Sequence, residues 1–307
     1  MSILVFGHKN PDTDTICSAI AYAELKGKLG KDVKAVRLGE VNEETKFVLD
    51  YFKVEKPELI ESVSGKEIML VDHNERTQTA NGFEEAKVLE LVDHHRISNF
   101  NVDEPLYVRM EPVGCTATII LKLFKENNLL TEPTTAGLML SAIVSDTLLF
   151  KSPTCTGCDV KAGKELAEIA GVNVEEYGLE MLKAGTALGG KSESELINMD
   201  MKIFEVDGSK IGVAQVNTVN EAELLERKEK LLAEINNIIN KEGLKFFIFT
   251  ITNILSNDSI GIVAGDGNAV IEKAFNEKID NNLIALKGVV SRKKQIIPPL
   301  TKAIQEA

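Results

Sequence analysis

The sequence predicts an α/β fold with two domains: an N-terminal domain with a doubly wound, mainly parallel sheet, and a smaller C-terminal α/β domain with a mixed sheet. Short apolar runs alternate with helical patterns through the first third of the 307 residues. The polar segment 188–195 (LGGKSESE) contains two glycines and is typical of a linker. Beyond it, Asp207-Gly208 between two apolar runs is a strong signal for a β-hairpin. We therefore expect domains at 1–187 and 196–307, joined by 188–195.

The elements of the N-terminal domain follow from apolar periodicity. Predicted strands lie at 2–7, 32–38, 67–72 and 87–93, and predicted helices at about 15–29, 42–52, 115–127 and 134–149. Strands that alternate with helices favour a parallel sheet, and ligands of such sheets bind beyond the carboxyl ends of the strands.

The C-terminal domain is predicted from the same patterns. Strands are expected at 200–206, 210–216, 244–252 and 259–264, and helices at 221–241 and about 268–277. The basic residues 292–294 come after an apolar pair and before two prolines, which predicts a loop at the end of a strand.

Composition narrows the function classes. Hydrophobic residues make up 44% and charged residues 27%, as in folded globular proteins. The net charge of −12 disfavours a nucleic-acid partner, although it permits a local basic pocket. Four cysteines do not suggest a disulfide scaffold, and the pair Cys155 and Cys158 lacks a second pair of ligands. Neither a signal peptide nor a membrane-spanning run is evident, so we expect a cytoplasmic protein.

Histidines and acids gather where predicted strands stop. The four histidines lie at strand ends or in acid-bearing turns, and the acids near them include one inside an apolar helix, Asp146, that needs a partner. The candidate residues are His8, Asp12, Asp14, Asp72, His73, Asp93, His94, His95 and Asp146. So many charges suit two metal ions about 3.5–4 Å apart. Mixed imidazole and carboxylate ligands favour manganese, cobalt, iron or zinc over magnesium. The residues alone thus predict a two-metal phosphohydrolase.

Three motifs add a resemblance. Segments 7–14 (GHKNPDTD), 71–74 (VDHN) and 93–95 (DHH) resemble the DHH phosphoesterase superfamily, which includes inorganic pyrophosphatases, exopolyphosphatases and single-strand nucleases. Segments 291–295 (SRKKQ) and 199–205 (MDMKIFE) resemble the manganese-dependent (family II) inorganic pyrophosphatases. The resemblance covers the whole chain, and the GGGH-type motif of the nucleases is missing.

The resemblance implies roles for particular residues. His8 and Asp12 would bind one metal ion, Asp14, His94 and Asp146 the other, and Asp72 both. His95 would face the phosphate, and Asp93 would orient a histidine. The catalytic and substrate-binding residues would be His95, Lys202, Arg292 and Lys293.

The resemblance also implies an activity: hydrolysis of inorganic pyrophosphate, a phosphoric anhydride, to two orthophosphates by a metal-bridging hydroxide in a cleft between the domains. Two Mn²⁺ (or Co²⁺) per subunit, additional Mg²⁺ or Mn²⁺ with the substrate, and a homodimer through the N-terminal domain are expected with it.

Two rival functions stay open. A short-chain polyphosphatase or a small-oligonucleotide phosphodiesterase would use the same metal residues, and the basic tail motif and the negative net charge argue for the smaller substrate. A non-enzymatic metal- or nucleotide-binding regulator would be expected to lack a metal ligand or the basic triplet, and the sequence retains both.

Overall fold

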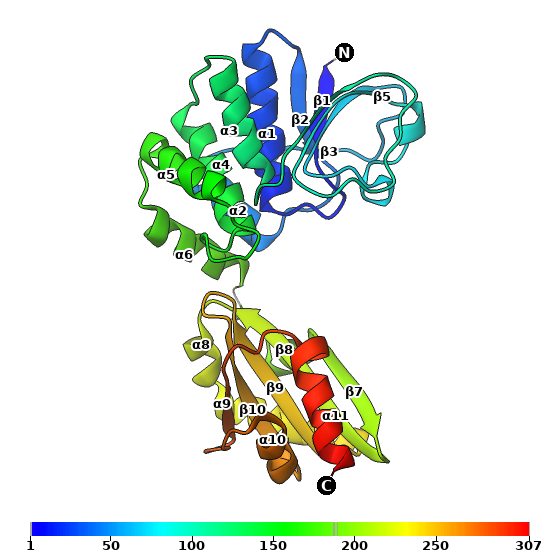
Figure 1. The fold of residues 1–307 in the computed structure, drawn as a ribbon, viewed down its shortest axis with the longest axis vertical. Helices are drawn as coiled ribbons and strands as arrows, with labels where there is room; N and C mark the ends of the chain where they lie inside the picture. Colours follow the sequence, from blue (N-terminus) through cyan, green and yellow to red (C-terminus); the bar gives the residue numbers. More distant parts are fainter. Residues whose placement is uncertain (1, 187, 189, 307) are drawn as a thin grey trace. The chain divides into compact units, whose positions relative to one another are not determined.

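The computed structural model describes residues 2–186, 188 and 190–306. The chain forms two compact units, Met1–Gly185 and Thr186–Ala307 (Figure 1). Helix α7 (Glu193–Asn198) begins inside the segment predicted as a linker. The boundaries of that linker stay a prediction, because residues 187 and 189 lie outside the described residues.

The N-terminal unit contains a six-stranded sheet in which every neighbouring pair of strands is parallel. Its strands are β1 (Ile3–Phe6), β2 (Val33–Arg37), β3 (Glu58–Leu59), β4 (Glu67–Val71), β5 (Lys87–Asp93) and β6 (Tyr107–Met110). The order β3-β2-β1-β4-β5-β6 is that of a doubly wound sheet. The predicted α/β class and parallel sheet are confirmed; β3 and β6 were not predicted.

The strand order fixes where a ligand can bind. The chain leaves β1 toward β2 on one side and later returns to place β4 on the other side of β1. The crevice at such a reversal, outside the carboxyl ends of the strands, is the usual ligand site of open α/β sheets. His8 follows β1 and Asp72 follows β4, so both lie at this reversal.

Figure 1 places the helices of this unit on one side of β1 and β2. They are α1 (Thr13–Lys28), α2 (Glu43–Tyr51), α3 (Thr116–Glu126), α4 (Pro133–Asp146), α5 (Gly157–Ala170) and α6 (Val174–Gly185). An apolar cluster joins strand residues such as Phe6 and Leu70 to Phe83 of the short 3-10 helix η2 (Phe83–Glu85). Another 3-10 helix, η1 (Arg76–Gln78), precedes it.

One expectation about α4 is corrected. Asp146 was predicted inside an apolar helix, but it is the last residue of α4. The chain cannot continue the helix because Leu148, Leu149 and Phe150 all have positive φ, between 47° and 64°. Asp146 therefore stands at a helix end.

The C-terminal unit has a five-stranded mixed sheet, as predicted, in the order β11-β10-β9-β8-β7. Only β8 and β9 pair in parallel. The strands are β7 (Met201–Val206), β8 (Ser209–Thr218), β9 (Phe246–Asn253), β10 (Asp258–Gly265) and β11 (Leu283–Leu286). Asp207 and Gly208 both have positive φ, 46° and 71°, as a tight hairpin turn between β7 and β8 requires.

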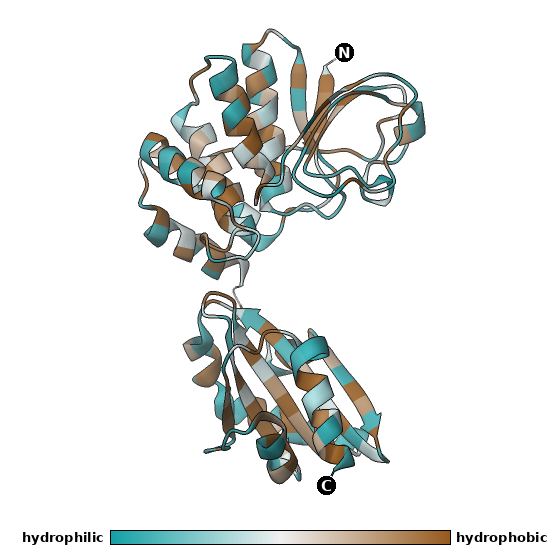
Figure 2. Cartoon of the chain, in the orientation of Figure 1, coloured by the Kyte–Doolittle hydropathy of each residue, from teal (hydrophilic) through white to brown (hydrophobic). Residues whose placement is uncertain are grey.

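Apolar side chains concentrate on the central strands of this sheet, which are brown in Figure 2. One cluster packs against α9 (Lys228–Glu242) through Leu231 and Ile235. The other packs against α10 (Asn268–Phe275) and α11 (Ile297–Gln305). The C-terminal sheet is thus covered by helices on both faces. Among the described residues, none of the helices is both long and apolar enough to cross a bilayer.

Two predictions for this unit were wrong in detail. The expected helix 221–241 is divided into α8 (Glu221–Leu225) and α9, because Arg227 leaves helical geometry and binds Glu193 at 2.9 Å. The expected loop at 292–294 is a helical turn, η3 (Arg292–Ile296). Ser291 caps that turn by accepting a hydrogen bond from the Lys294 amide, and α11 follows directly.

Two helical glycines offer a matched test of packing in the N-terminal unit. A Cβ on Gly137 of α4 would lie 2.2 Å from the ring of Phe52, whereas a Cβ on Gly27 of α1 would meet nothing within 4 Å. We expect Gly137→Ala to lower the free energy of unfolding by about 1–3 kcal/mol, and Gly27→Ala to leave it unchanged or raise it by up to about 1 kcal/mol. Urea unfolding measures both; equal effects would contradict the packing described here.

Candidate metal centre

The first group of potential metal ligands surrounds the start of α1. His8 Nε2 lies 3.3 Å from Asp12 Oδ2 and 3.6 Å from Asp72 Oδ2. Asp12 is the N-cap of α1, and its other oxygen accepts a hydrogen bond from the Thr15 amide at 2.9 Å. The cap therefore fixes the carboxylate with one oxygen toward the helix and the other toward His8.

The second group lies on the other side of Asp72. His94 Nε2 is 3.4 Å from Asp72 Oδ1, 3.6 Å from Asp146 Oδ2 and 3.9 Å from Asp14 Oδ2. Asp14 is completely buried and accepts hydrogen bonds from the Ser18 hydroxyl at 2.5 Å and the Thr116 amide at 2.7 Å. In each group the potential ligand atoms lie within 4.8 Å of one another.

Asp72 belongs to both groups, and its surroundings hold it between them. It is 1% exposed and has a φ of 59°, a left-handed conformation that costs a non-glycine residue about 1–3 kcal/mol. Thr15 of α1 donates to Oδ2 at 2.7 Å, and Thr116 of α3 donates to Oδ1 at 3.2 Å. Each Asp72 oxygen thus accepts one hydrogen bond from a threonine hydroxyl and keeps a lone pair for a further partner.

The loop after β5 is fixed by a buried amide. Asn74 Nδ2 donates to Asp93 Oδ2 at 2.6 Å and to the Arg96 carbonyl at 2.9 Å, and Asn74 Oδ1 accepts from the Ser98 amide at 2.7 Å. Asp93 Oδ1 in turn lies 2.9 Å from His95 Nδ1. This network holds His95 beside Asp72, at 3.7 Å between Nδ1 and Oδ1.

The acids of the site repel one another. Burial and the charge of Asp14 raise the pKa of Asp72 to about 7. Burial, Asp14 and Asp72 raise the pKa of Asp146 well above its usual value. Burial lowers the pKa of His94, but its contacts with Asp72 and Asp14 outweigh this and raise it to about 9. The site thus takes up protons unless another positive charge enters it.

The donor set fits divalent cations. His94 Nδ1 donates to the Val113 carbonyl at 3.1 Å, which leaves Nε2 directed at the carboxylates. That Nε2 is buried and makes no hydrogen bond within the described part of the chain. An imidazole held in this way by its other nitrogen is the usual arrangement of a metal-binding histidine. Bonds of about 2.0–2.2 Å to one ion would place two ligand atoms roughly 3–4 Å apart, and the distances within each group are of that order.

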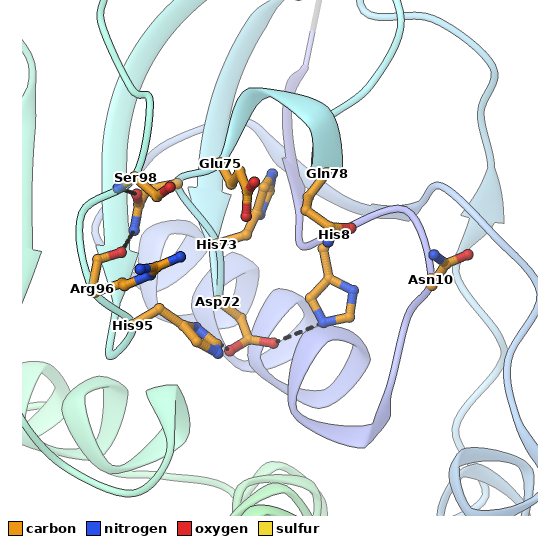
Figure 3. A pocket seen from close by; sticks show the side chains of 10 residues that line it. His8, Asn10, Asp72, His73, Glu75, Gln78, His95, Arg96 and Ser98 are labelled. Carbon is orange, nitrogen blue, oxygen red and sulfur yellow. Dashed lines mark hydrogen bonds and ion pairs between the residues drawn. The ribbon is translucent and has the colours of Figure 1, made fainter. Parts of the chain in front are cut away.

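A pocket of about 270 Å³ opens beside Asp72. Figure 3 shows His8, Asp72 and His95 directed toward one another on one wall. His73 lies on another wall and in none of the ligand groups. Burial lowers its pKa to about 4, so its ring is neutral and its Nδ1 donates to the Val71 carbonyl at 3.0 Å. The pocket is lined by His8, Asn10, Asp72, His73, Asn74, Glu75, Gln78, His95, Arg96 and Ser98.

The predicted substrate-binding cations lie in the C-terminal unit. Lys202 is an exposed residue of β7, and Lys293 is exposed in η3. Arg292 pairs with Asp200, just before β7, at 2.8 Å, and its amide donates to Gln215 of β8 at 3.0 Å. These contacts bring Arg292 and Lys202 to the same end of β7. That these three residues face the candidate metal ligands across a cleft between the domains stays a prediction.

The fold and the site together define a two-domain α/β protein with a carboxylate–histidine cluster that could hold metal ions. Residues 2–143 match the DHH family, N-terminal domain, and residues 179–303 match the DHHA2 domain. A "Probable manganese-dependent inorganic pyrophosphatase" of Bacillus cereus (strain ATCC 10987) is 56% identical over 305 residues, which cover 99% of each chain. A Bacillus anthracis (strain CDC 684) protein of the same name is 55% identical over the same share.

Solved structures agree with these matches. A Methanococcus jannaschii protein assigned as a family II inorganic pyrophosphatase is 43% identical, with a TM-score of 0.64, covering 99% of this chain and 100% of that one. An exopolyphosphatase-related protein from Bacteroides fragilis shares the fold, at 13% identity and a TM-score of 0.52, over 99% of this chain and 92% of its own. The chain therefore belongs to the manganese-dependent (family II) inorganic pyrophosphatases of the DHH superfamily.

The structure brings together seven of the predicted acids and histidines, His8, Asp12, Asp14, Asp72, His94, His95 and Asp146. The residues that hold these side chains in place were not predicted. Thr15, Thr116 and Asn74 bind four of the acids, yet each is a residue type that also occurs commonly at helix starts and in turns. Of these three residues, only Asn74 could have been linked to the site from the sequence, because it directly follows Asp72 and His73.

Metal removal should change how stability depends on pH. Without metal ions, raised pKa values stabilise the fold at low pH. This stability is lost between pH 3.8 and about 7 for Asp72 and between pH 6.5 and about 9 for His94. Metal binding requires the deprotonated ligands and so is favoured as the pH rises. Calorimetry of manganese-loaded and chelator-treated protein should show melting temperatures that diverge as the pH rises from about 6 to 9; parallel curves would contradict this.

Proposed function

We propose that this chain hydrolyses inorganic pyrophosphate to two orthophosphates. One observation carries the proposal: Asp72 belongs to every group of potential metal ligands among the described residues. The chain that carries it is 56% identical over 305 residues to a protein named "Probable manganese-dependent inorganic pyrophosphatase". The net charge of −12 favours a small anion, drawn in by bound cations, over a long polyanion.

His8, Asp12 and Asp72 would hold one metal ion, and Asp14, Asp72, His94 and Asp146 the other. The distances of 3.3–3.9 Å between these ligand atoms support that division. Two Mn²⁺ or Co²⁺ suit the mixed ligands, and a further Mg²⁺ or Mn²⁺ would arrive with the substrate. Such ions lower the pKa of bound water and offset the charge that develops on phosphoryl oxygens.

His95 is placed to act on the substrate. Its Nδ1 contacts Asp93, which raises the pKa of His95, while 53% of its side chain is exposed at the pocket. The protonated ring can therefore keep Nδ1–H on Asp93 and offer Nε2–H to a phosphate oxygen. Asp93 fixes the orientation of the ring. We infer that His95 donates a hydrogen bond, or a proton, to the leaving phosphate.

Lys202, Arg292 and Lys293 would bind the remaining phosphate oxygens. Arginine suits bidentate contact with phosphate, and lysine supplies a compact charge. Arg292 would exchange its contact with Asp200, which is half-exposed, for a contact with the substrate. Such a contact in a site sheltered from water would contribute more than the same contact on an open surface.

The activity is tested by phosphate release. Protein preloaded with manganese or cobalt, with magnesium added, is given pyrophosphate, tripolyphosphate or a dinucleotide. We expect fast release from pyrophosphate alone, because the resemblance of the tail motif is to the pyrophosphatases. Preference for tripolyphosphate or the dinucleotide would leave the metal centre in place and favour the rival phosphohydrolases. No turnover of any of them would favour a binding protein.

Lys202 has a matched control on the same hairpin. Lys202→Gln should lower kcat/KM for pyrophosphate by about 10- to 100-fold, because it removes a charge-assisted hydrogen bond of roughly 1.5–3 kcal/mol. Lys210→Gln, an exposed lysine next to the turn, should change it less than about twofold. Steady-state kinetics at saturating manganese measures both, and similar values for the two variants would remove Lys202 from the site.

A homodimer through the N-terminal domain is supported by β6. Within the described residues this edge strand pairs with β5 alone, and its Tyr107 and Val108 are 44% and 47% exposed. In sedimentation experiments we expect a dimer that Val108→Asp dissociates, while Leu130→Asp, at a residue 84% exposed elsewhere, leaves it intact. A monomeric unaltered protein would contradict the proposal. The cytoplasmic location stays a prediction.

A further inference from the structure

The sequence contains six arginines, and five of them make ion pairs with acids. These five are Arg37, Arg76, Arg109, Arg227 and Arg292. Arg96 is the exception: its guanidinium makes no hydrogen bond or ion pair with any residue the structure describes. Several exposed lysines also lack an acidic partner, but among the arginines Arg96 is alone in this within the described residues.

Arg96 lies on the wall of the pocket beside Asp72. Figure 3 shows it next to His95 on that wall. The other ionisable residues lining the pocket are His8, Asp72, His73, Glu75 and His95. None of them carries a permanent positive charge, so Arg96 supplies the only one among the residues that line this pocket. Glu111, which shares a second hollow with Arg96, already pairs with Arg109 and Lys122.

The backbone of Arg96 is held although its side chain is exposed. Its carbonyl accepts a hydrogen bond from Asn74, which is 3% exposed and also binds Asp93 and the Ser98 amide. The same amide thus positions the segment that carries both His95 and Arg96. A guanidinium on a fixed backbone loses less freedom when it binds an anion than one on a mobile loop.

We propose that Arg96 binds phosphate oxygens of the substrate from the N-terminal domain. This rests on the proposed function and adds a substrate contact to it. The planar guanidinium offers two parallel N–H groups, which match two oxygens of one phosphate group. With its charge unpaired by any acid, Arg96 binds that group without first breaking an ion pair, unlike Arg292.

The contact is expected in the bound substrate as well as in the transition state, so its loss should appear in KM and not in kcat. We expect Arg96→Gln to raise KM for pyrophosphate, and the inhibition constant of orthophosphate, about tenfold, because one charge-assisted contact of roughly 1.5 kcal/mol is lost. Arg96→Lys should keep part of the effect, since it retains the charge without the paired N–H groups. Manganese content should be unchanged in both variants.

The control is Lys31→Gln. It removes the same charge from an exposed residue beyond the far end of α1, about 24 Å along the 16-residue helix from the site. This variant should retain the KM and the inhibition constant of the unaltered protein. If Arg96→Gln also retains both constants within twofold, or lowers kcat alone, then Arg96 is a solvated surface residue and the inference is wrong.

A binding measurement separates this inference from the proposed function. Inorganic phosphate is titrated calorimetrically into the manganese-loaded protein and into each variant. If the unaltered protein does not turn over pyrophosphate, the proposed function fails. Weaker phosphate binding by Arg96→Gln would then still support an anion contact at Arg96. Equal binding by the two proteins would overturn it.

Discussion

Mutual repulsion among closely spaced carboxylates, two of them buried, is the constraint on which the site depends. Asp14, Asp72 and Asp146 converge on His94, and Asp12 approaches Asp72 through His8. At an effective dielectric constant of about 20, two such charges 4 Å apart cost about 4 kcal/mol. Protonation relieves this repulsion, and the raised pKa values of Asp72 and Asp146 express that response. Divalent cations relieve it without using up the ligands, which is why the site suits metal ions.

The topology of the sheet brings these acids together. Because β1 and β4 are neighbours at the reversal of strand order, the residues that follow them meet although 64 positions separate His8 from Asp72. The starts of α1 and α3 reach the same place and supply hydroxyl and amide donors from Thr15 and Thr116. The strained backbone of Asp72 is tolerated since these contacts hold its carboxylate from both sides. These contacts direct one Asp72 oxygen toward His8 and the other toward His94.

The sequence predicted a site because His8, Asp72 and Asp93 lie where apolar runs stop. Asp12 and Asp14 lie in the turn after the first of these runs, and Asp146 interrupts a further apolar run. A buried acid among apolar residues requires a partner, and that argument holds whether Asp146 lies inside a helix or at its end. The supports could not be predicted in the same way. Thr116 contacts Asp72 across 44 positions, and such a contact depends on side-chain rotamers. Likewise, the sequence does not distinguish Arg96 from the other surface cations, because only the folded structure shows that it has no acidic partner among the described residues.

The most direct test of the shared carboxylate is electron paramagnetic resonance of the manganese-loaded protein. Two Mn²⁺ held about 3.5–4 Å apart by a common ligand should be magnetically coupled. The spectrum should therefore change from that of a coupled pair to that of isolated ions in Asp72→Asn. A spectrum of isolated Mn²⁺ in the unaltered protein at two ions per chain would contradict the account, because Asp72 would then join no pair of ions.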